Sequence, residues 1–206
     1  MDTLTVRVKW KEKSEILENL DGCRFNEFPM KQGLEAEVKM VEACGHFFVL
    51  KILNKQAKPD AEKQFRLLKA LACQGIAVAE PHGWGTAENG APVLLTSYDG
   101  ECMREVAPDK LVSMADALAS LHDIPTSMKN EMQLGVKDFP SYFFPACSEY
   151  PDLQEKLEQL LSMVDIRQFD MIHGDLHWEN VVENEGEMTI IDWTNIQFGD
   201  RRYDVA

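Results

Sequence analysis

The sequence predicts an α+β fold with two lobes, and three observations support this. Strand patterns and one helical pattern fill residues 1–97, helical patterns dominate residues 98–206, and the charge divides at the same point. The first part holds 13 basic and 13 acidic residues, and the second holds 8 basic and 22 acidic residues, so the net charge of −14 lies entirely in the second. We therefore expect a β lobe with one main helix over 1–97 and a mainly helical lobe over 98–206.

The elements of the first part follow from short apolar runs and their breaks. Residues 4–10 alternate weakly, and two stronger strand patterns at 37–41 and 46–53 are joined by a turn at 43–45. A helix is expected to begin at Pro59-Asp60, since apolar residues follow at helical spacing until Gly75. The run at 92–96 then predicts a buried strand that ends at Asp99-Gly100, where we place the hinge between the lobes.

The second part begins with two amphipathic helical patterns. Apolar residues at 111, 114, 115, 118 and 121 share one helical face, and residues 152–164 repeat such a pattern. Beyond them, a hairpin is expected around a turn at 184–187. If Glu185 and Gly186 form the centre of that turn, Val181 pairs with Ile190 and Asn180 pairs with Ile191.

This register brings oxygen-bearing side chains together at the open end of the hairpin. Asp192 follows the second strand at once, so it leaves the hairpin beside Asn180. Asp175 lies five residues before Asn180, on the loop that enters the same end. Hard divalent cations such as Mg²⁺ take oxygen ligands of this kind. We therefore expect these three residues to converge on one site.

Composition limits the class of protein. A chain of 206 residues that is 45% hydrophobic and 27% charged, without low-complexity tracts, is typical of a globular protein. We expect no signal peptide and no membrane partner, because the start lacks a basic and then apolar pattern and no apolar run approaches roughly 20 residues. The acidic second part disfavours nucleic acid. The five scattered cysteines, with no Cys-x-x-Cys pair, favour reduced thiols and a cytoplasmic location.

The stretch HGDLHWEN at 173–180, followed by IDW at 191–193, resembles the catalytic loop and metal-binding aspartate of protein kinases. It is more similar still to the aminoglycoside phosphotransferase family, which includes choline, homoserine and fructosamine kinases. The segments LHDIP at 121–125 and RRYDVA at 201–206 also match that family, whose members have a buttressing Asp in the latter segment. The resemblance implies a bilobal protein-kinase-like fold with an N-terminal antiparallel β lobe. It also implies that the helical lobe ends short of the family's last helices, which would leave apolar surface exposed on 111–122 and 152–164.

The same resemblance implies roles for individual residues. Asp175 would be the catalytic residue that orients the acceptor hydroxyl and takes its proton, and Asn180 and Asp192 would hold Mg²⁺. Lys51 would contact the inner phosphates of ATP or GTP, and Gly33 would lie in the loop that covers the nucleotide. The list of nucleotide-binding candidates is completed by the hinge residues Thr96 and Tyr98 and by Gln64.

Gln64 marks a departure from the family pattern. The family pairs the strand lysine with a helix glutamate, but the alignment puts Gln64 in that position. At 100° per residue, Gln64 falls on the arc of Phe65 and Leu68, whereas Glu62 lies about 160° away and would pair with Arg66 or Lys69 at the surface. Gln64 can accept a hydrogen bond from the lysine but supplies no charge.

Three functions remain open from the sequence. The first is a phosphotransferase that moves the γ-phosphoryl group of ATP or GTP to a hydroxyl of a small molecule, such as an aminoglycoside or another cationic amino-alcohol. The second is a degenerate, non-catalytic nucleotide-binding module, favoured by Gln64. The third is a hydrolase with a transition metal on His173, Asp175 and His177. The sequence does not define the oligomeric state.

Overall fold

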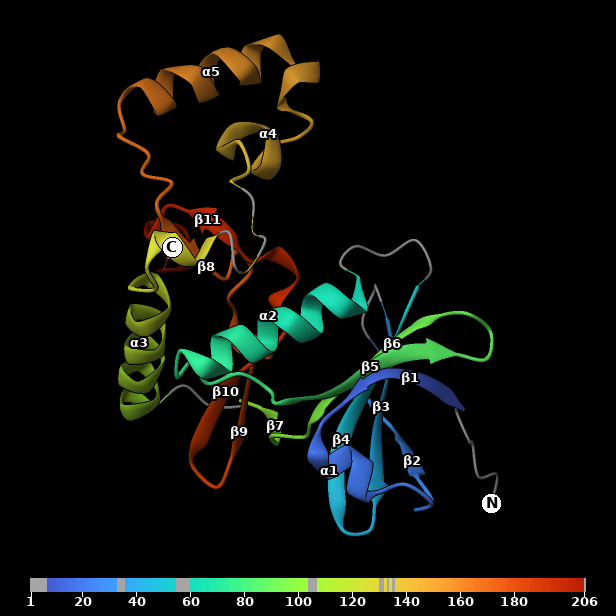
Figure 1. Cartoon of the computed structure of the whole chain (residues 1–206). Helices are drawn as coiled ribbons and strands as arrows, with labels where there is room; N and C mark the ends of the chain where they lie inside the picture. Colours follow the sequence, from blue (N-terminus) through green and yellow to red (C-terminus); the bar gives the residue numbers. More distant parts are fainter. Residues whose placement is uncertain are drawn as a thin grey trace. The chain divides into compact units, whose positions relative to one another are not determined.

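The structure is a computed structural model, and it describes residues 7–32, 36–54, 60–103, 107–129, 132, 134 and 136–205. The chain divides into two compact units (Figure 1). The first unit comprises residues 1–104 and 178–194, and the second comprises residues 105–177 and 195–206. The hairpin near residue 185 thus groups with the first unit, whereas the sequence predicted it within the lobe 98–206. The boundary at 97/98 stays a prediction.

The first unit is built on a six-stranded antiparallel sheet with the strand order β1-β5-β6-β4-β3-β2. This confirms the predicted α+β class and its antiparallel β lobe. The strands are β1 (Val8–Lys13), β2 (Asn26–Pro29), β3 (Ala36–Ala43), β4 (His46–Leu53), β5 (Pro81–Ala87) and β6 (Pro92–Ser97).

The sheet packs its inner residues against a short helix, α1 (Glu15–Asn19). Ser14 caps this helix through a hydrogen bond from the amide of Leu17 to the Ser14 hydroxyl. Leu17 then enters a core with Phe48 and Leu50 of β4. Because side chains alternate along a strand, Phe48 and Leu50 point to one face of the sheet and Lys51 points to the other. The alternation of side chains along β4 therefore places Lys51 on the face opposite to this core.

The predicted main helix is α2 (Ala61–Cys73), which packs against β5 and β6 (Figure 1). Asp60 caps it by accepting a hydrogen bond from the amide of Glu62, and Gly75 follows its end with φ +78°. Phe65, Leu68 and Leu71 are buried on the sheet side, as the helical spacing predicted.

The strand β5 was not predicted from the sequence, because glycine interrupts its apolar pattern. Gly85 lies opposite Trp10 of β1, and a Cβ at Gly85 would stand 2.5 Å from the carbonyl oxygen of Lys9. Glycine is therefore present because two backbones approach closely, a reason that no local pattern reveals.

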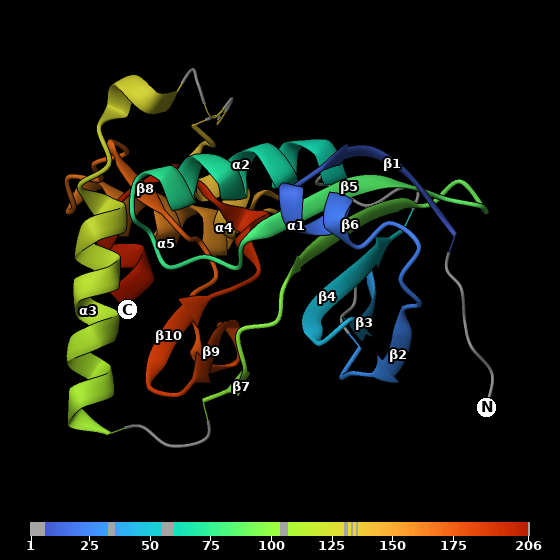
Figure 2. The ribbon, with the colours of Figure 1, turned by 60° about the horizontal axis from the view of Figure 1, so that its bottom comes forward.

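The first unit also contains a three-stranded sheet made of β7 (Glu101–Cys102), β9 (Val181–Asn184) and β10 (Glu187–Ile190), visible together in Figure 2. It joins the predicted hairpin to the segment that follows the hinge. Gly100 precedes β7 with φ +105°, and a Cβ there would collide with the carbonyl group of Glu183. The hinge glycine is thus required by both its backbone conformation and its close neighbour.

Helices dominate the second unit: α3 (Pro108–His122), α4 (Phe139–Phe143), α5 (Pro151–Ser162) and the 3₁₀ turns η1 (Thr126–Lys129), η2 (Cys147–Glu149) and η5 (Arg201–Val205). Two short strands, β8 (Asp170–Ile172) and β11 (Gln197–Gly199), pair antiparallel within it. The expected exposure of apolar side chains is confirmed on α3 and α5, where Val112 is 61% exposed and Leu160 62%. No described helix has the length and apolar character to cross a membrane.

One expectation about cysteine is wrong. Cys23 and Cys44 form a disulfide in the first unit, where five reduced thiols were expected. Cys44 lies in the tight turn between β3 and β4, and the amide of Cys23 bonds to the carbonyl of Leu20 after α1. These two turns bring the Cα atoms within 6.5 Å, a separation that a disulfide can bridge. The pairing depends on tertiary contacts, which the spacing of cysteines along the sequence does not encode.

Candidate functional site

The hairpin has the register that the sequence predicted. Val181 pairs with Ile190 across β9 and β10, and the amide of Ile191 donates a 2.9 Å hydrogen bond to the carbonyl of Asn180. Asp192 follows Ile191, so Asn180 and Asp192 lie at the same open end. Asn180 closes the 3₁₀ turn η3 (Trp178–Asn180) and is 7% exposed.

Asp192 has a backbone conformation that few residues other than glycine adopt. Its φ is +63°, in the left-handed region. The hydroxyl of Thr194 donates a 2.9 Å hydrogen bond to the Asp192 carboxylate, and the buried indole of Trp193 donates one of 2.9 Å to the carbonyl of Ile190. Backbone strain held in place by neighbours in this way is common at functional sites.

The donor set at this end fits a hard cation. Asn180 offers an amide oxygen and Asp192 a carboxylate, which are the ligand types that Mg²⁺ accepts while it keeps water and phosphate oxygens. Among the described residues, no group of three or more His, Cys, Asp and Glu side chains is arranged to hold a metal ion. The arrangement therefore does not support the hydrolase alternative, which required His173, Asp175 and His177 to share one metal.

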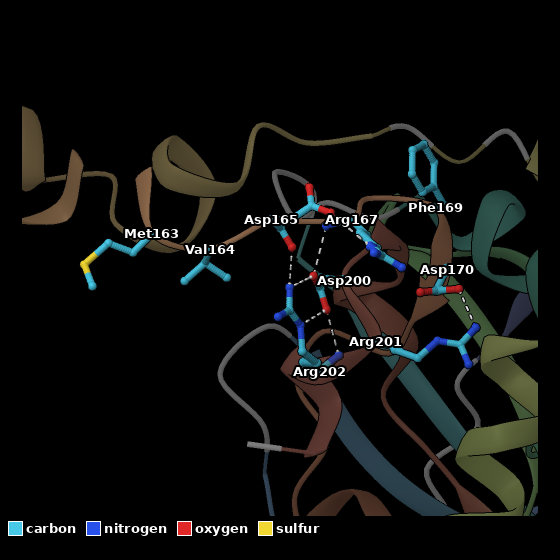
Figure 3. Close-up of a pocket in the computed structure, with 9 residues that line it drawn as sticks. All are labelled: Met163, Val164, Asp165, Arg167, Phe169, Asp170, Asp200, Arg201 and Arg202. Carbon is cyan, nitrogen blue, oxygen red and sulfur yellow. Dashed lines mark hydrogen bonds and ion pairs between the residues drawn. The ribbon is translucent and has the colours of Figure 1, made fainter. Parts of the chain in front are cut away.

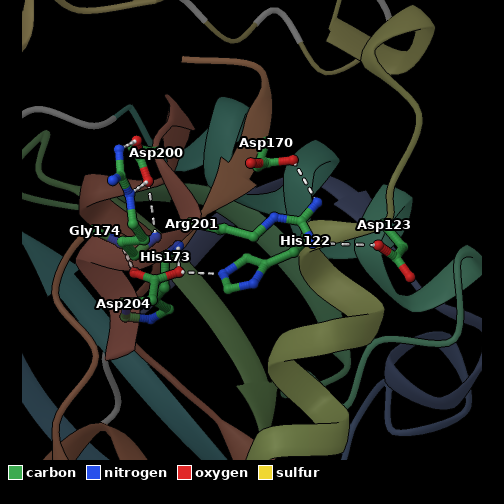
Figure 4. A network of polar contacts seen from close by, with 9 residues as sticks. His122, Asp123, Asp170, His173, Gly174, Asp200, Arg201 and Asp204 are labelled. Atoms are coloured by element: carbon green, nitrogen blue, oxygen red, sulfur yellow. Dashed lines mark hydrogen bonds and ion pairs between the residues drawn. The ribbon is translucent and has the colours of Figure 1, made fainter. Parts of the chain in front are cut away.

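The loop before Asp175 is braced from within the second unit (Figure 4). The carboxylate of Asp204 accepts hydrogen bonds of 2.9 Å from the amide of His173 and 2.9 Å from the amide of Gly174. Nε2 of His122, on α3, lies 3.1 Å from the same carboxylate. All four residues are buried. Asp204 is thus the buttressing Asp that the segment at 201–206 was expected to supply.

Gly174 fixes the path of this loop. Its φ is +80°, and a Cβ there would lie 2.6 Å from the carbonyl oxygen of Asn195. The Asn195 side chain is in turn held by the hydroxyl of Tyr142, which donates a 2.6 Å hydrogen bond to its Oδ1 atom. Asp175 follows Gly174 and is exposed, so the buried loop presents this carboxylate at its surface. Asp175 belongs to the second unit, whereas Asn180 and Asp192 belong to the first, and their convergence stays a prediction.

Lys51 lies on the central strand β4, where it pairs with Leu94 of β6. The next pair on the same face is Val49 with Thr96, so Lys51 and Thr96 share one face of the sheet. Thr96 is buried, and Lys51 is partly exposed. The side chain of Lys51 makes no hydrogen bond or ion pair with another described residue.

The helix α2 distributes its polar residues as predicted. Gln64 is 8% exposed beside Phe65 and Leu68, whereas Glu62 forms a surface ion pair of 2.7 Å with Arg66. The predicted surface partner of Glu62 is therefore confirmed. The role of Gln64 toward Lys51 stays a prediction.

At the hinge, backbone groups already have partners within the first unit. The amide of Ser97 donates to the carbonyl of Glu80 at 2.8 Å, and the amide of Tyr98 donates to the carbonyl of Phe47 at 3.3 Å. Burial raises the pKa of Asp99, which accepts a 3.0 Å hydrogen bond from the hydroxyl of Ser97. The remaining nucleotide candidate, Gly33, lies outside the described residues.

A cavity of about 770 Å³ lies elsewhere in the second unit. Figure 3 shows the residues that line it. Its charged groups are paired: Arg202 binds Asp200, and Arg201 binds Asp170 at 2.6 Å. Its described lining contains no residue that the sequence analysis assigned to the site. The lining residues are Met163, Val164, Asp165, Arg167, Phe169, Asp170, Asp200, Arg201 and Arg202.

Three residues near Asp175 were not assigned to the site from the sequence: His122, Tyr142 and Asn195. The LHDIP segment at 121–125 was noted, but the role of its histidine depends on contact with Asp204, 82 residues away. Tyr142 and Asn195 are separated by 53 residues. Spacing along the chain carries no signal for such contacts.

Comparison with known proteins identifies the family. The model of the phosphotransferase enzyme family matches residues 29–206. The chain belongs to this family. The resemblance of the HGDLHWEN and IDW segments to aminoglycoside phosphotransferases is thereby confirmed, and membership supports phosphotransferase activity toward a small molecule. No curated protein matches the sequence of this chain.

Solved structures of phosphotransferases share the fold. A spectinomycin phosphotransferase in complex with ADP and spectinomycin is 13% identical, with 98% of this chain and 73% of that chain covered and a TM-score of 0.64. An aminoglycoside phosphotransferase in complex with ADP and hygromycin B is 14% identical, with 92% and 73% covered and a TM-score of 0.64. A macrolide 2′-phosphotransferase from Brachybacterium faecium is 18% identical, with 91% and 76% covered and a TM-score of 0.57. At these identities the likeness establishes the kinase-like fold.

Proposed function

We propose that this phosphotransferase moves the γ-phosphoryl group of ATP or GTP to a hydroxyl group of a small molecule, with an aminoglycoside or another cationic amino-alcohol as the acceptor. The observation that carries the proposal is the hairpin end, where Asn180 lies opposite Ile191 and Asp192 follows in a left-handed conformation. Family membership supports the reaction class. We place the protein in the cytoplasm, where its nucleotide co-substrate is available.

Asp175 has the chemistry of the catalytic residue. An exposed carboxylate on a buried, hydrogen-bonded loop can accept a hydrogen bond from an acceptor hydroxyl and fix that hydroxyl's orientation. As the new O–P bond forms, the bond from the γ-phosphorus to the β,γ-bridging oxygen breaks and releases the nucleoside diphosphate, while the hydroxyl proton passes to the carboxylate. The rigidity of the loop matters because phosphoryl transfer depends mainly on positioning and on stabilisation of charge.

The phosphate groups require positive charge. Lys51, which is partly exposed on β4, is proposed to bind phosphate oxygens of the nucleotide. Asn180 and Asp192 are proposed to hold Mg²⁺, which when bound would neutralise the charge that spreads over the transferring group. Thr96 and Tyr98 remain the proposed hinge contacts, and Gly33 the proposed covering-loop residue.

The test is a phosphate-transfer screen with ATP and GTP over amino sugars and small amino-alcohols. Asp175→Asn is expected to lower transfer by about 10²–10⁴-fold, since it removes the proton acceptor and leaves the loop's hydrogen bonds in place. Nucleotide affinity, measured by calorimetry, is expected to stay unchanged. Asp116→Asn, on the exposed face of α3, is the matched control. Unchanged transfer in Asp175→Asn would refute the proposal.

Gln64 favours a second candidate, a nucleotide-binding module without catalysis. It is buried on α2 in the position where the family pattern has an acidic residue, and Glu62 is occupied by Arg66 at the surface. Lys51 would then lack its usual counter-charge. Tight nucleotide binding without phosphate transfer or release across the whole acceptor panel would select this reading.

A further inference from the structure

The cavity of about 770 Å³ in the second unit has no part in the proposed phosphate transfer. We call it the 163–202 cavity, after the first and last residues of its lining. Its volume lies in the range of small-molecule sites, which is roughly 300–1,000 Å³. Three aspartates and three arginines supply its charged lining, so their formal charges cancel. A lining of this kind suits a ligand without net charge.

All three arginines of the second unit line this cavity, namely Arg167, Arg201 and Arg202. The unit holds 7 Lys and Arg against 15 Asp and Glu, so its overall charge is negative. Such a unit repels a carboxylate group except where guanidinium groups gather. The 163–202 cavity is therefore a place where a carboxylate group finds compensating charge.

Arg202 fixes one wall of the cavity. Its Nε and Nη2 atoms donate to the buried carboxylate of Asp200, and Nη2 also donates a 2.7 Å hydrogen bond to the carbonyl of Asp165. The amide of Arg167 donates a 3.0 Å hydrogen bond to the same Asp200 carboxylate. The backbone at 165–167 is therefore held from both ends before any ligand binds. A preorganised wall of this kind loses less conformational freedom on binding.

One ion pair of the lining is open to a ligand. Arg201 is occupied by Asp170, which accepts a 2.6 Å hydrogen bond from it. In the remaining pair, Nε of Arg167 donates a 3.1 Å hydrogen bond to the carboxylate of Asp165, and both side chains are largely exposed. Neither makes another side-chain hydrogen bond or ion pair with a described residue. Because an exposed pair contributes little to stability, a ligand can separate the two groups at little cost.

Apolar side chains flank this open pair. Met163, at the end of α5, is 81% exposed, Val164 follows it, and Phe169, just before β8, is 68% exposed. In Figure 3 the Asp165–Arg167 pair lies between Val164 and Phe169. Single exposed apolar residues are common in proteins, but three around one cavity form an apolar wall. An apolar group bound beside the pair would remove this wall from water.

We propose that the 163–202 cavity binds a small zwitterion, namely an α-amino acid with an apolar side chain. Its carboxylate binds the guanidinium group of Arg167, its ammonium group binds the carboxylate of Asp165, and its side chain covers Met163 and Phe169. Adjacent opposite charges are required because the two protein groups lie only 3.1 Å apart. A ligand with one charge would leave a member of the pair facing its own sign. This site goes beyond the proposed function, and binding there requires no nucleotide.

The experiment compares four probes that differ only in their charged groups. Phenylalanine carries both, N-acetylphenylalanine only the carboxylate, phenylalanine amide only the ammonium group, and N-acetylphenylalanine amide neither. Binding to the whole chain is measured by ligand-observed NMR without nucleotide. Phenylalanine is expected to bind about three-fold more tightly than each singly charged probe and about ten-fold more tightly than the uncharged one, as exposed ion pairs allow. Glycine, which lacks the apolar side chain, is expected to bind at least about ten-fold more weakly than phenylalanine.

Two variants give opposite changes that misfolding cannot imitate. Arg167→Gln is expected to weaken binding of N-acetylphenylalanine about three-fold and to leave binding of phenylalanine amide no weaker. Asp165→Asn is expected to weaken binding of phenylalanine amide about three-fold and to leave binding of N-acetylphenylalanine no weaker. The matched controls are Lys156→Gln and Asp152→Asn, which change exposed charges on α5 outside the lining. Neither control is expected to alter the affinity of any probe.

Three outcomes would overturn the proposal. The first is equal affinity for all four probes, and the second is tighter binding of a singly charged probe than of phenylalanine. The third is an equal loss of both singly charged probes in Arg167→Gln, which would indicate damage to the fold instead of a lost contact. Because every measurement is made without nucleotide, none of these outcomes bears on the proposed phosphate transfer.

Discussion

The carboxylate of Asp204 binds the backbone amide of His173 at 2.9 Å, although the two residues lie 31 positions apart. The same carboxylate binds the amide of Gly174 and contacts His122. One buried side chain therefore holds the loop that presents Asp175, and its removal leaves several polar groups without an acceptor. This relationship allows a direct test of the loop's rigidity.

Asp204→Ala is expected to lower the free energy of unfolding by about 3 kcal/mol, because buried donors lose a charged acceptor. The free energy of unfolding is measured by urea titration, with circular dichroism as the signal. Asp116→Ala, an exposed aspartate within α3, is expected to change stability by less than about 0.5 kcal/mol. Equal stability of Asp204→Ala and the parent chain would contradict the bracing role.

Asp192→Asn tests the hairpin end. It keeps the shape of the side chain and its contact with Thr194, but it removes the charge that a cation requires. We expect phosphate transfer to fall at least about 100-fold and the Mg²⁺ concentration for half-maximal activity to rise. Glu187→Gln, an acidic residue at the other end of β10, serves as control. An unchanged Mg²⁺ dependence would exclude Asp192 as a ligand.

Gln64→Glu tests whether α2 faces Lys51 in the way the family pattern implies. A buried glutamate is tolerated only when a cation is within reach, so we expect the variant to retain its stability within about 1 kcal/mol. Adding Lys51→Met to Gln64→Glu is then expected to cost roughly 2 kcal/mol more than Lys51→Met alone. Calorimetric unfolding of the four chains gives the coupling. If it is zero and Gln64→Glu is itself strongly destabilising, the alignment that pairs these residues is wrong.

Asp200 gives a prediction about acid stability. Hydrogen bonds from Arg202, aided by the amide of Arg167, hold the pKa of Asp200 well below its usual range. Because the folded state lowers this pKa, Asp200 contributes stability above the unfolded-state pKa of about 4, and that contribution is lost as the pH falls below it. Asp200→Asn is therefore expected to reduce stability at pH 7 and to flatten its decline between about pH 5 and pH 2. If the stability of Asp200→Asn falls with pH as steeply as that of the parent chain, the assigned role of Asp200 is wrong.

The hairpin could be predicted to the residue because its information is local. Glu185 and Gly186 both have positive φ, as a tight turn requires. A tight turn fixes the register of its two strands, so Val181 must pair with Ile190. The main helix was also predictable, since its buried face follows the helical period. In both cases, turn chemistry and periodicity agree with the tertiary structure.

Other features had no local signal. β5 was missed because Gly85 serves the close approach of β1, a contact with a strand more than 70 residues earlier. The contacts of Asp204 and Tyr142 join segments that only the fold brings together. Family resemblance gave the expected place of the buttressing aspartate but not its partner His122.

The bond between Cys23 and Cys44 closes the intervening chain, including β2 and all of β3, into a covalent ring. A ring of this size restricts the unfolded chain and is worth about 3 kcal/mol in the loop-entropy description. The stability of the sheet therefore depends on whether its surroundings are reducing or oxidising. A reductant opens the ring, and an oxidant preserves it. A single peptide-bond cleavage inside the ring would leave the two fragments linked until that bond is reduced.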